Sequence, residues 1–249
     1  GRNHHAFANQ SVCSVLEQGL PEDVELRYTW VDDASDPPVF GGLESQTEMV
    51  VVRKPVRCGA LANFYREALR HIEPDTVVFP LGGDDYLLPG ALRRVSELFA
   101  DPQCWVMYGS YEASSPSHNL RPRPMTDQPF RDQPFIFMPL CYRAPLLTKI
   151  RPRDLQMGGM WQPSAGDVAF TLPMLEMAGR ERIRFNEQPI MLYNVHEGND
   201  GATDKYLQDF CSWYSRNRPG YKRLERIEDP AVIDHDAPGS TLSHIFVPR

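Results

Sequence analysis

Two pairs of adjacent aspartates, Asp32-Asp33 and Asp84-Asp85, are the side chains of this sequence best suited to do chemistry together. Neighbouring carboxylates repel each other unless a cation or hydrogen-bond donors lie between them. Hard divalent ions such as Mg²⁺ and Mn²⁺ prefer oxygen ligands that they share with substrate phosphates. A metal-bound diphosphate is therefore the simplest ligand for four such carboxylates. The alternative for each pair is structural, because Asp and Gly are common in turns and residues 82–85 (GGDD) could form a tight hairpin.

Each aspartate pair follows a segment with the pattern of a β-strand. Residues 24–31 alternate apolar and polar side chains, and residues 77–81 form a short apolar run. In an open parallel sheet, ligands bind outside the carboxyl ends of the strands. The two pairs are therefore expected to face one crevice.

Strands and helices are predicted to alternate along the chain. In the first half, apolar spacing predicts helices over 6–18, 60–71 and 90–99 and further strands over 49–52 and 105–108. In the second half it predicts a strand over 135–142, a helix over 167–178 that contains Pro173, and strands over 183–185 and 189–195. This order is typical of an α/β fold with a mostly parallel sheet flanked by helices.

Five segments, in this order, resemble motifs of glycosyltransferase family 2. They are residues 30–36 (WVDDASD), similar to the family's V-D-D-G-S strand end; 59–63 (GALAN), similar to its helix start; 78–92 (VFPLGGDDYLLPGAL), similar to its D-x-D region; 165–167 (AGD), similar to its E-D motif; and 193–196 (YNVH), similar to its Y-R-x-H. The match covers about residues 6–199. It implies a single domain of the Rossmann-related GT-A fold that transfers a sugar, with inversion, from a nucleotide-sugar donor.

The resemblance also implies which residues bind the donor. Asp32 or Asp33 would hold the uracil or ribose of the nucleotide, with Asn63 of the next motif and Arg57 just before that motif. Asp84 would face the diphosphate. A UDP-sugar is the expected donor.

Metal and catalytic roles follow from the later motifs. Asp84, with Asp85 and His196, would hold a Mn²⁺ or Mg²⁺ ion that stabilises charge on the leaving diphosphate. Asp167 would be the general base that takes the proton from an acceptor hydroxyl. For His196 a purely structural role is an equal alternative.

The acceptor-binding residues are expected in the second half of the chain. Trp161 could stack on a sugar or acceptor, although an ordinary core tryptophan would have the same sequence signature. The polar segment 114–134 is too long for a simple connection, and its Arg121 and Arg123 are candidates for acceptor or phosphate recognition. The alternative is that this segment is an ordinary solvent-exposed loop without a binding role.

Three departures separate the chain from the family pattern. Gly82 stands where the family has the first acid of D-x-D, and Gly166 stands where an acid precedes the base. The sequence also opens at Gly1, where the family would already have completed a first strand. We therefore expect a weaker metal site and an incomplete nucleotide pocket if that strand is absent.

Composition limits the other classes of function. The 249 residues, with 41% hydrophobic and 24% charged side chains, fit one folded, soluble domain. We expect that domain over 1–228, with a nucleotide-binding half over 1–112, an acceptor-binding half over 113–228 and a C-terminal tail over 229–249. The net charge of −7 argues against nucleic acid as a partner. Five scattered cysteines and the lack of a signal peptide or membrane-spanning run favour a cytoplasmic protein, and no heptad indicates an oligomeric state.

Two other functions share some of these features. A non-catalytic nucleotide- or sugar-binding module on the same fold would keep Asp32 and Asp33 and would not need Asp167. The GDD segment also resembles the apolar hairpin of RNA-dependent RNA polymerases, in which adjacent aspartates hold two metal ions for nucleotidyl transfer.

Overall fold

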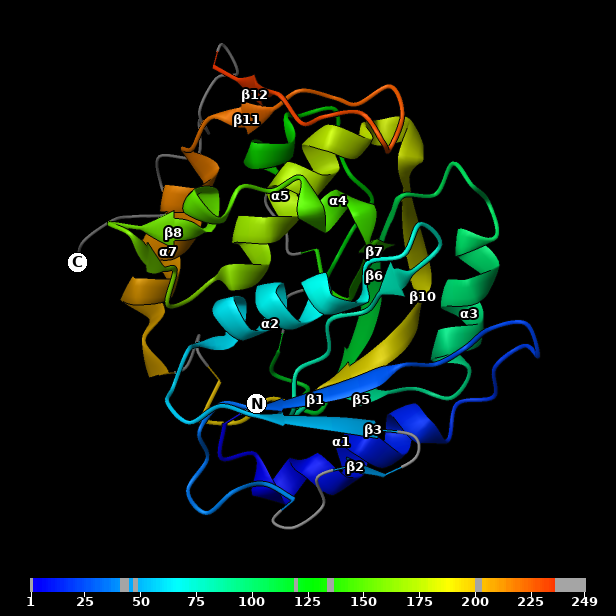
Figure 1. The fold of residues 1–249 in the computed structure, drawn as a ribbon, viewed down its shortest axis with the longest axis vertical. Helices are drawn as coiled ribbons and strands as arrows, with labels where there is room; N and C mark the ends of the chain where they lie inside the picture. Colours follow the sequence, from blue (N-terminus) through cyan, green and yellow to red (C-terminus); the bar gives the residue numbers. More distant parts are fainter. Residues whose placement is uncertain are drawn as a thin grey trace.

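Strands and helices alternate through the part of the chain that the structure, a computed structural model, describes: residues 2–40, 45–46, 49–118, 121–133, 137–199 and 203–235 (Figure 1). The helices are α1 (His5–Leu16), α2 (Ala60–Ala68), α3 (Ala91–Phe99), α4 (Pro145–Thr148), α5 (Gly166–Ala178) and α7 (Lys205–Arg216), with 3₁₀ turns at η1 (Leu69–His71), η2 (Phe130–Asp132), η3 (Pro152–Leu155) and η4 (Arg180–Arg182). The strands are β1 (Tyr28–Asp32), β2 (Ser45–Gln46), β3 (Met49–Arg53), β4 (Val77–Val78), β5 (Tyr86–Leu87), β6 (Val106–Ala113), β7 (Leu140–Arg143), β8 (Gln156–Met157), β9 (Met160–Trp161), β10 (Ile183–Tyr193), β11 (Gly220–Tyr221) and β12 (Ile233–Asp234).

The strands form a small N-terminal sheet and a larger central sheet. The N-terminal sheet has the order β1-β3-β2, and the central sheet has the order β4-β7-β6-β10-β5. Only β1 with β3 and β6 with β10 pair in parallel among the described strands. The α/β class is confirmed, and the sheet is mixed because β7 and β5 return antiparallel beside β6 and β10.

The central sheet is covered by helices on both faces. Val106 and Tyr108 of β6 point into one core with residues of α2, α4 and α5, whereas Met107 between them points into a second core with residues of α1 and α3. This alternation is the period of two that a strand buried on both sides requires. A third core packs α1 against the β1–β3 sheet, around Trp30.

The order of the strands excludes a hairpin at the GDD segment. Gly82 to Asp85 connects β4 to β5, and these two strands lie at opposite edges of the central sheet. The tight-hairpin interpretation of this segment is therefore wrong. The polymerase alternative depended on the same hairpin and loses its support with it.

Most predicted elements are present with shifted ends. Helices α2 and α3 begin close to the predicted residues, whereas the strands predicted over 24–31 and 77–81 shrink to β1 and β4. The two strands predicted over 183–195 are one strand, β10, with an irregularity between Asn186 and Met191. Within the strand predicted over 135–142 and the loop over 114–134, residues 119–120 and 134–136 lie outside the described residues. Helix α7 was not predicted.

None of the helices in the described part of the chain has the length and apolar character that crossing a membrane would need.

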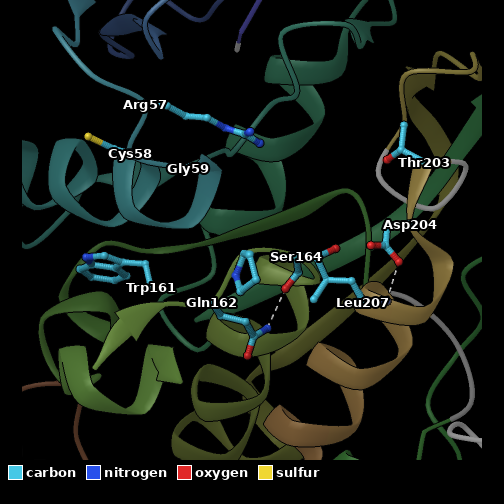
Figure 2. A pocket seen from close by; sticks show the side chains of 10 residues that line it. Arg57, Cys58, Gly59, Trp161, Gln162, Ser164, Thr203, Asp204 and Leu207 are labelled. Carbon is cyan, nitrogen blue, oxygen red and sulfur yellow. Dashed lines mark hydrogen bonds between the residues drawn. The ribbon is translucent and has the colours of Figure 1, made fainter. Parts of the chain in front are cut away.

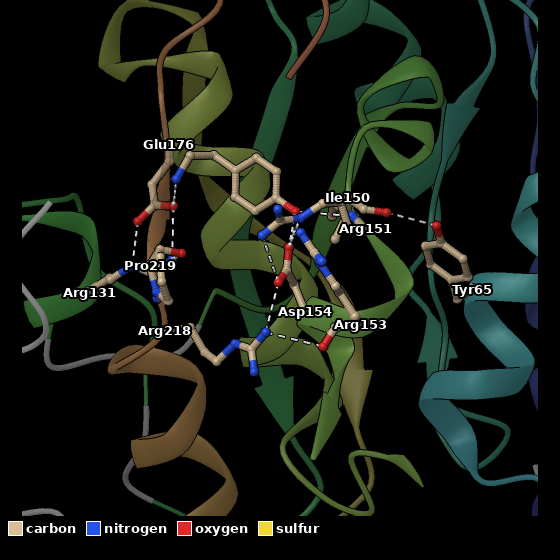
Figure 3. A network of polar contacts seen from close by, with 10 residues as sticks. Tyr65, Arg131, Ile150, Arg151, Arg153, Asp154, Glu176, Arg218 and Pro219 are labelled. Carbon is tan, nitrogen blue, oxygen red and sulfur yellow. Dashed lines mark hydrogen bonds and ion pairs between the residues drawn. The ribbon is translucent and has the colours of Figure 1, made fainter. Parts of the chain in front are cut away.

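A buried ion pair fixes α5 to the elements behind it. Arg131 of η2 contacts Glu176 of α5 through two bonds, Nε to Oε1 at 2.5 Å and Nη2 to Oε2 at 2.9 Å (Figure 3). The third arm, Nη1, donates to the Ser215 carbonyl of α7 at 2.6 Å, and Glu176 also accepts from the backbone N–H of Tyr221 at 2.9 Å. One guanidinium therefore connects α5, α7 and η2.

A second network holds η3 against the end of α7. Asp154 accepts from Arg151 at 2.6 Å, from Arg218 at 2.8 Å and from the Tyr221 hydroxyl at 2.6 Å (Figure 3). Burial alone would raise the pKa of Asp154, but these hydrogen bonds outweigh it and lower the pKa. The carboxylate is therefore kept ionised as a structural anchor.

We predict that Arg131→Met destabilises the fold by about 3–5 kcal/mol, because it leaves the buried Glu176 carboxylate without its partner. Arg27→Met is the matched control: Arg27 pairs with Glu25 and Glu73 at the surface, where solvent screens the ion pairs and their loss should change stability little. Urea denaturation measures both free energies of unfolding. Equal losses in the two variants would contradict the structural role given to Arg131.

Candidate functional site

Asp32 shapes the loop that follows β1. Its carboxylate is buried and accepts the backbone N–H groups of Ser35 at 3.0 Å and Val39 at 3.1 Å. Both oxygens therefore serve the loop itself. Asp32 is one of the two predicted nucleotide contacts, and both of its carboxylate oxygens already accept hydrogen bonds from this loop.

Asp33 connects the β1 loop to the start of α2. Its oxygens accept the backbone N–H groups of Cys58 at 2.7 Å and Gly59 at 2.9 Å. Burial would raise its pKa, but these bonds and a hydrogen bond from Asn63 outweigh it and hold the pKa below its ordinary value. The predicted pair Asp33 and Asn63 is thus brought together, with an anionic carboxylate at the N-terminus of a helix.

The Asp84–Asp85 turn is possible because residue 82 has no side chain. A Cβ at Gly82 would lie 2.7 Å from Asp85 Oδ2 and 2.8 Å from Asp84 Oδ1. The carboxylates of Asp84 and Asp85 therefore occupy the space that the side chain of an acidic residue at position 82 would need. This steric conflict explains why glycine replaces the first acid of D-x-D here.

Asp85 is the buried member of the pair. It is only 5% exposed, and its Oδ1 accepts the backbone N–H of Asn194 at 2.9 Å. Burial, followed by repulsion from Asp84, raises its pKa to about 7 despite that hydrogen bond. Near neutral pH Asp85 is therefore partly protonated, and the Asp84–Asp85 pair carries less than two full negative charges.

Asp84 faces the segment after β10. Its Oδ2 lies 2.9 Å from Nε2 of His196 and 3.4 Å from the amide of Asn199. Since the Gly198 N–H donates to Nδ1 of His196 at 3.1 Å, that nitrogen is an acceptor, and Nε2 carries the proton that Asp84 accepts. The predicted pairing of Asp84 with His196 is present. The ring of Phe7 stacks on His196 with centroids 4.9 Å apart.

Asp167 lies in the first turn of α5, where the helix dipole favours a carboxylate. The helix starts close to α2, since a Cβ at Gly166 would lie 3.0 Å from Leu61 Cβ. This contact accounts for the glycine that replaces the acid expected there. Burial first, and then the charges of Asp85, Asp84 and Asp167 with Tyr111, raises the pKa of Tyr193 to about 12. Tyr193 therefore lies within electrostatic reach of both the aspartate pair and the predicted base.

A cavity of about 430 Å³ opens between α2, α5 and α7 (Figure 2). Its lining comprises Arg57, Cys58, Gly59, Trp161, Gln162, Pro163, Ser164, Thr203, Asp204 and Leu207. Cys58 and Gly59 are the residues that bind Asp33, and Ser164 precedes Asp167 by three residues. The cavity thus lies between the predicted nucleotide contact and the predicted base.

Trp161 and Arg57 both line this cavity, as Figure 2 shows. The Trp161 ring is half-buried, 5.4 Å from the Tyr65 ring and 5.6 Å from the Arg66 guanidinium. An aromatic face with a cation beside it can bind a sugar or another hydroxyl-bearing ring. That Trp161 stacks on a sugar or acceptor stays a prediction.

Arg121 and Arg123 belong to a different part of the surface. Arg121 donates to the His118 carbonyl at 2.8 Å and lies 5.7 Å from the Tyr111 ring. The Tyr111 hydroxyl is 2.8 Å from His118, and both rings contact Tyr193. Arg121 is therefore connected to Tyr193 through the ring of Tyr111, and the pKa of Tyr193 is raised in part by Asp84 and Asp85. Arg123 is exposed, and its carbonyl accepts the Tyr108 hydroxyl at 2.9 Å.

The described residues contain no set of three or more His, Cys, Asp or Glu side chains already placed to hold a metal ion. Two imidazoles nevertheless lie beside the Asp84 carboxylate. Nδ1 of His4 is buried without a hydrogen-bond partner and points at Asp84 Oδ1 from 3.8 Å, while His196 approaches Oδ2. A carboxylate between two imidazoles offers oxygen and nitrogen donors of the kind that divalent metals accept.

Several residues near this site were not predicted. His4 and Asn199 contact Asp84, and Asp204 caps α7 by accepting the Leu207 N–H at 2.9 Å. Helix α7 could have been found, since Asp204 is a good N-cap and Leu207, Phe210, Cys211 and Tyr214 have helical spacing. His4 could not, because its contact joins residues 80 positions apart in the chain.

Solved structures with a similar fold bind nucleotide sugars. TarS 1-349 from S. aureus in complex with UDP-GlcNAc aligns with a TM-score of 0.64 at 15% identity, over 87% of this chain and 62% of that one. Its complex with UDP aligns with a TM-score of 0.60 at 15% identity, over 86% and 62% of the two chains. The mannosyltransferase PcManGT from Pyrobaculum calidifontis, in complex with GDP-Man and Mn²⁺, has a TM-score of 0.50 at 15% identity, over 81% and 56%.

The chain spans between 36% and 62% of the TarS chains that it matches. No protein-family model and no curated protein matches its sequence significantly. At this level of identity the shared property is the fold. The chain therefore has the α/β fold of these nucleotide-sugar-binding proteins.

We predict that the stability of the protein without added metal falls as pH rises from about 4 to 7, by up to about 4 kcal/mol from Asp85 alone. The unfolded carboxyl titrates near 3.8 and the folded one near 7, so between these values the folded state holds a proton that the unfolded state has lost. Asp85→Asn keeps an oxygen for the Asn194 N–H and should remove this slope. Chemical denaturation at several pH values measures it, and parallel curves for wild type and variant would contradict the raised pKa.

Proposed function

We propose that this chain transfers a sugar from a nucleoside diphosphate donor, a UDP-sugar in preference, to an acceptor hydroxyl with inversion at the anomeric carbon. One observation carries the proposal. A cavity is lined both by Cys58 and Gly59, which bind Asp33, and by Ser164, three residues before Asp167, on a fold shared with UDP-GlcNAc- and GDP-Man-bound structures. A leaving-group site and a base at one end of one sheet are what such a transfer requires.

The nucleotide would bind along the β1 loop and the start of α2. Asp33 fixes the backbone of Cys58 and Gly59 there, and Arg57 beside them supplies a positive charge at the cavity. Asn63 supports Asp33 from within α2. In this proposal Asp33 and Asn63 act by shaping the nucleotide pocket, and Arg57 contacts the donor.

The donor diphosphate would lie at Asp84, where His196 and His4 face the carboxylate. A divalent cation held by Asp84 and the two imidazoles would supply positive charge for the leaving diphosphate. Asp85 carries only part of a full negative charge near neutral pH, because its pKa is raised to about 7 by burial and by Asp84. That leaves the Asp84 carboxylate as the main anion of the turn.

Asp167 would accept the proton of the acceptor hydroxyl as that oxygen attacks the anomeric carbon. The bond from the anomeric carbon to the diphosphate oxygen breaks in the same displacement, and its electron pair leaves with the nucleoside diphosphate. Asp167 lies at the N-terminus of α5, which the Arg131–Glu176 pair holds in place. A base on a rigid helix keeps its position relative to the attacking hydroxyl.

The acceptor would enter the cavity lined by Trp161 and Ser164. The Oγ of Ser164 is buried without a hydrogen-bond partner, so it is available to a polar ligand in that cavity. Trp161 offers a half-buried aromatic face on the same wall. An acceptor that carries hydroxyl groups on a ring satisfies both side chains.

We predict that Asp167→Asn lowers turnover by about 10²–10⁴-fold while donor affinity stays within a factor of about two, because only the proton acceptor is removed. Release of nucleoside diphosphate from a panel of UDP- and GDP-sugars measures turnover, and calorimetry measures donor binding. Asp101→Asn is the control, since Asp101 pairs with Arg184 at the opposite end of β6. Unchanged turnover in Asp167→Asn would favour a non-catalytic binding module on this fold.

We predict that Trp161→Ala lowers kcat/KM for the acceptor by about tenfold and leaves the Kd of the donor unchanged, because the lost contact is aromatic stacking. Trp161→Phe should recover most of the loss. Initial rates at varied acceptor and fixed donor concentration test this. If only the Kd of the donor changes, Trp161 contacts the donor and not the acceptor, which would contradict this prediction.

A further inference from the structure

Helix α7 directs its aromatic side chains toward solvent. Tyr206 is 65% exposed and Trp213 is 36% exposed, and their spacing places them on the same side of the helix. Phe210 lies between them and stacks on Trp213, with ring centroids 6.0 Å apart. The side that faces the protein carries Ser215 and Arg216, which are buried and hydrogen-bonded. A surface helix ordinarily has its apolar stripe on the core side, so the outward aromatic face of α7 is unusual.

The β8–β9 hairpin extends this face. Met157 Sδ lies 3.8 Å from Cys211 Sγ, which places the hairpin beside α7 (Figure 1). At its tip, Gly158 and Gly159 have positive φ angles, and a Cβ at either would meet no atom of the described residues within 4 Å beyond its chain neighbours. Met160, the next residue, is 74% exposed. The tip therefore projects into solvent and carries an apolar side chain.

Most of the exposed large apolar side chains in the described part of the chain gather on these two elements. They are Met160, Tyr206, Leu207 and Trp213, which we call the α7 patch. Contiguous apolar surface of this kind marks an interaction site in proteins that otherwise cover their apolar side chains.

Exposed cations lie beside the α7 patch. The guanidinium of Arg66 is 5.6 Å from the ring of Trp161, the residue after Met160. Arg153, in η3 just before the hairpin, is also exposed, and its carbonyl accepts from Arg218 at the end of α7. No acidic side chain of the described residues forms an ion pair with Arg66 or Arg153.

The acidic side chains of the same face are already engaged. Asp154 and Asp209 lie in ion pairs, and Asp204 caps α7. The α7 patch is therefore bordered by a positive excess in a chain whose net charge is −7. This local charge is complementary to an anionic surface.

The shape of the α7 patch favours a lipid surface over a peptide or a partner helix. Those partners bind in a groove or along an open sheet edge, whereas the patch is a convex helix beside a projecting hairpin tip. Trp and Tyr combine an apolar ring with a polar group and are enriched where lipid tails meet headgroups. Basic side chains beside such an apolar face are attracted to anionic headgroups.

We propose that the α7 patch inserts into an anionic lipid surface, with Arg66 and Arg153 at the level of the headgroups. Met160, Tyr206 and Trp213 enter the boundary between headgroups and acyl chains, while the body of the protein stays outside. The proposal concerns a surface beyond the sugar-transfer site and does not depend on the proposed function.

The test measures flotation of the full chain with vesicles of phosphatidylcholine alone or of phosphatidylcholine with phosphatidylglycerol. We expect binding to the anionic vesicles that weakens in neutral vesicles and at high salt. The double variant Met160→Ser, Trp213→Ser should lower the partition coefficient by about tenfold or more, and Arg66→Gln with Arg153→Gln should lower it on anionic vesicles only. Val50→Ser is the matched control, because Val50 is 52% exposed on the N-terminal sheet. Thermal melts confirm that each variant is folded.

The fluorescence of Trp213 reports insertion directly. Trp30 and Trp105 are buried and Trp161 is half-buried, so lipids with brominated acyl chains should quench Trp213 most. Trp213→Phe should still bind vesicles and lose most of this quenching.

Three results would overturn the proposal. They are the absence of vesicle binding by wild type, equal binding by the Met160→Ser, Trp213→Ser variant and by Val50→Ser, and self-association without vesicle binding that the double variant abolishes. The last result, seen by sedimentation velocity, would assign the α7 patch to contact with a second copy of the chain. None of the three affects the proposed function, because sugar transfer is measured without vesicles.

Discussion

The repulsion between the neighbouring carboxylates of Asp84 and Asp85 is the constraint on which the candidate site depends. Gly82 leaves the space that both carboxylates occupy, and Asp85 accepts a backbone N–H while its pKa is raised to about 7 by burial and by Asp84. Asp84 is faced by His196 on one oxygen and by His4 on the other. Elements from three regions of the chain therefore meet at these two carboxylates.

The rest of the fold keeps the predicted base at a fixed distance from this turn. Helix α5 contacts α2 so closely that residue 166 has no side chain, and the Arg131–Glu176 pair fastens its other face to α7. The mixed central sheet contributes β10, whose end delivers Tyr193 and the segment that carries His196. The predicted base is thus carried by α5, whereas Asp84 and His196 lie in segments next to β5 and β10 of the central sheet.

Much of this arrangement could be predicted from the sequence, because local patterns encode it. Apolar spacing located α2 and α3, and the two aspartate pairs follow β1 and β4 as predicted. The roles within each pair could not be predicted, since Asp32 differs from Asp33 only in which distant N–H groups it accepts. The antiparallel return of β7 and the approach of His4 are also set by tertiary packing, which leaves no local pattern. From the sequence alone, Gly82 and Gly166 indicate only that two acidic side chains are absent. The contacts that exclude a side chain at these two positions come from residues distant in the chain, Asp84 and Asp85 aside.

The most direct test of the account is a calorimetric titration of UDP, with GDP as the comparison, into the protein with and without Mn²⁺. The account predicts that one nucleotide, UDP in preference, binds with a stoichiometry of about one and needs Mn²⁺ for its full affinity. Asp84→Ala should abolish the Mn²⁺-dependent part. Failure of both nucleotides to bind in either condition would contradict the central claim that this edge of the sheet is a nucleotide-sugar site.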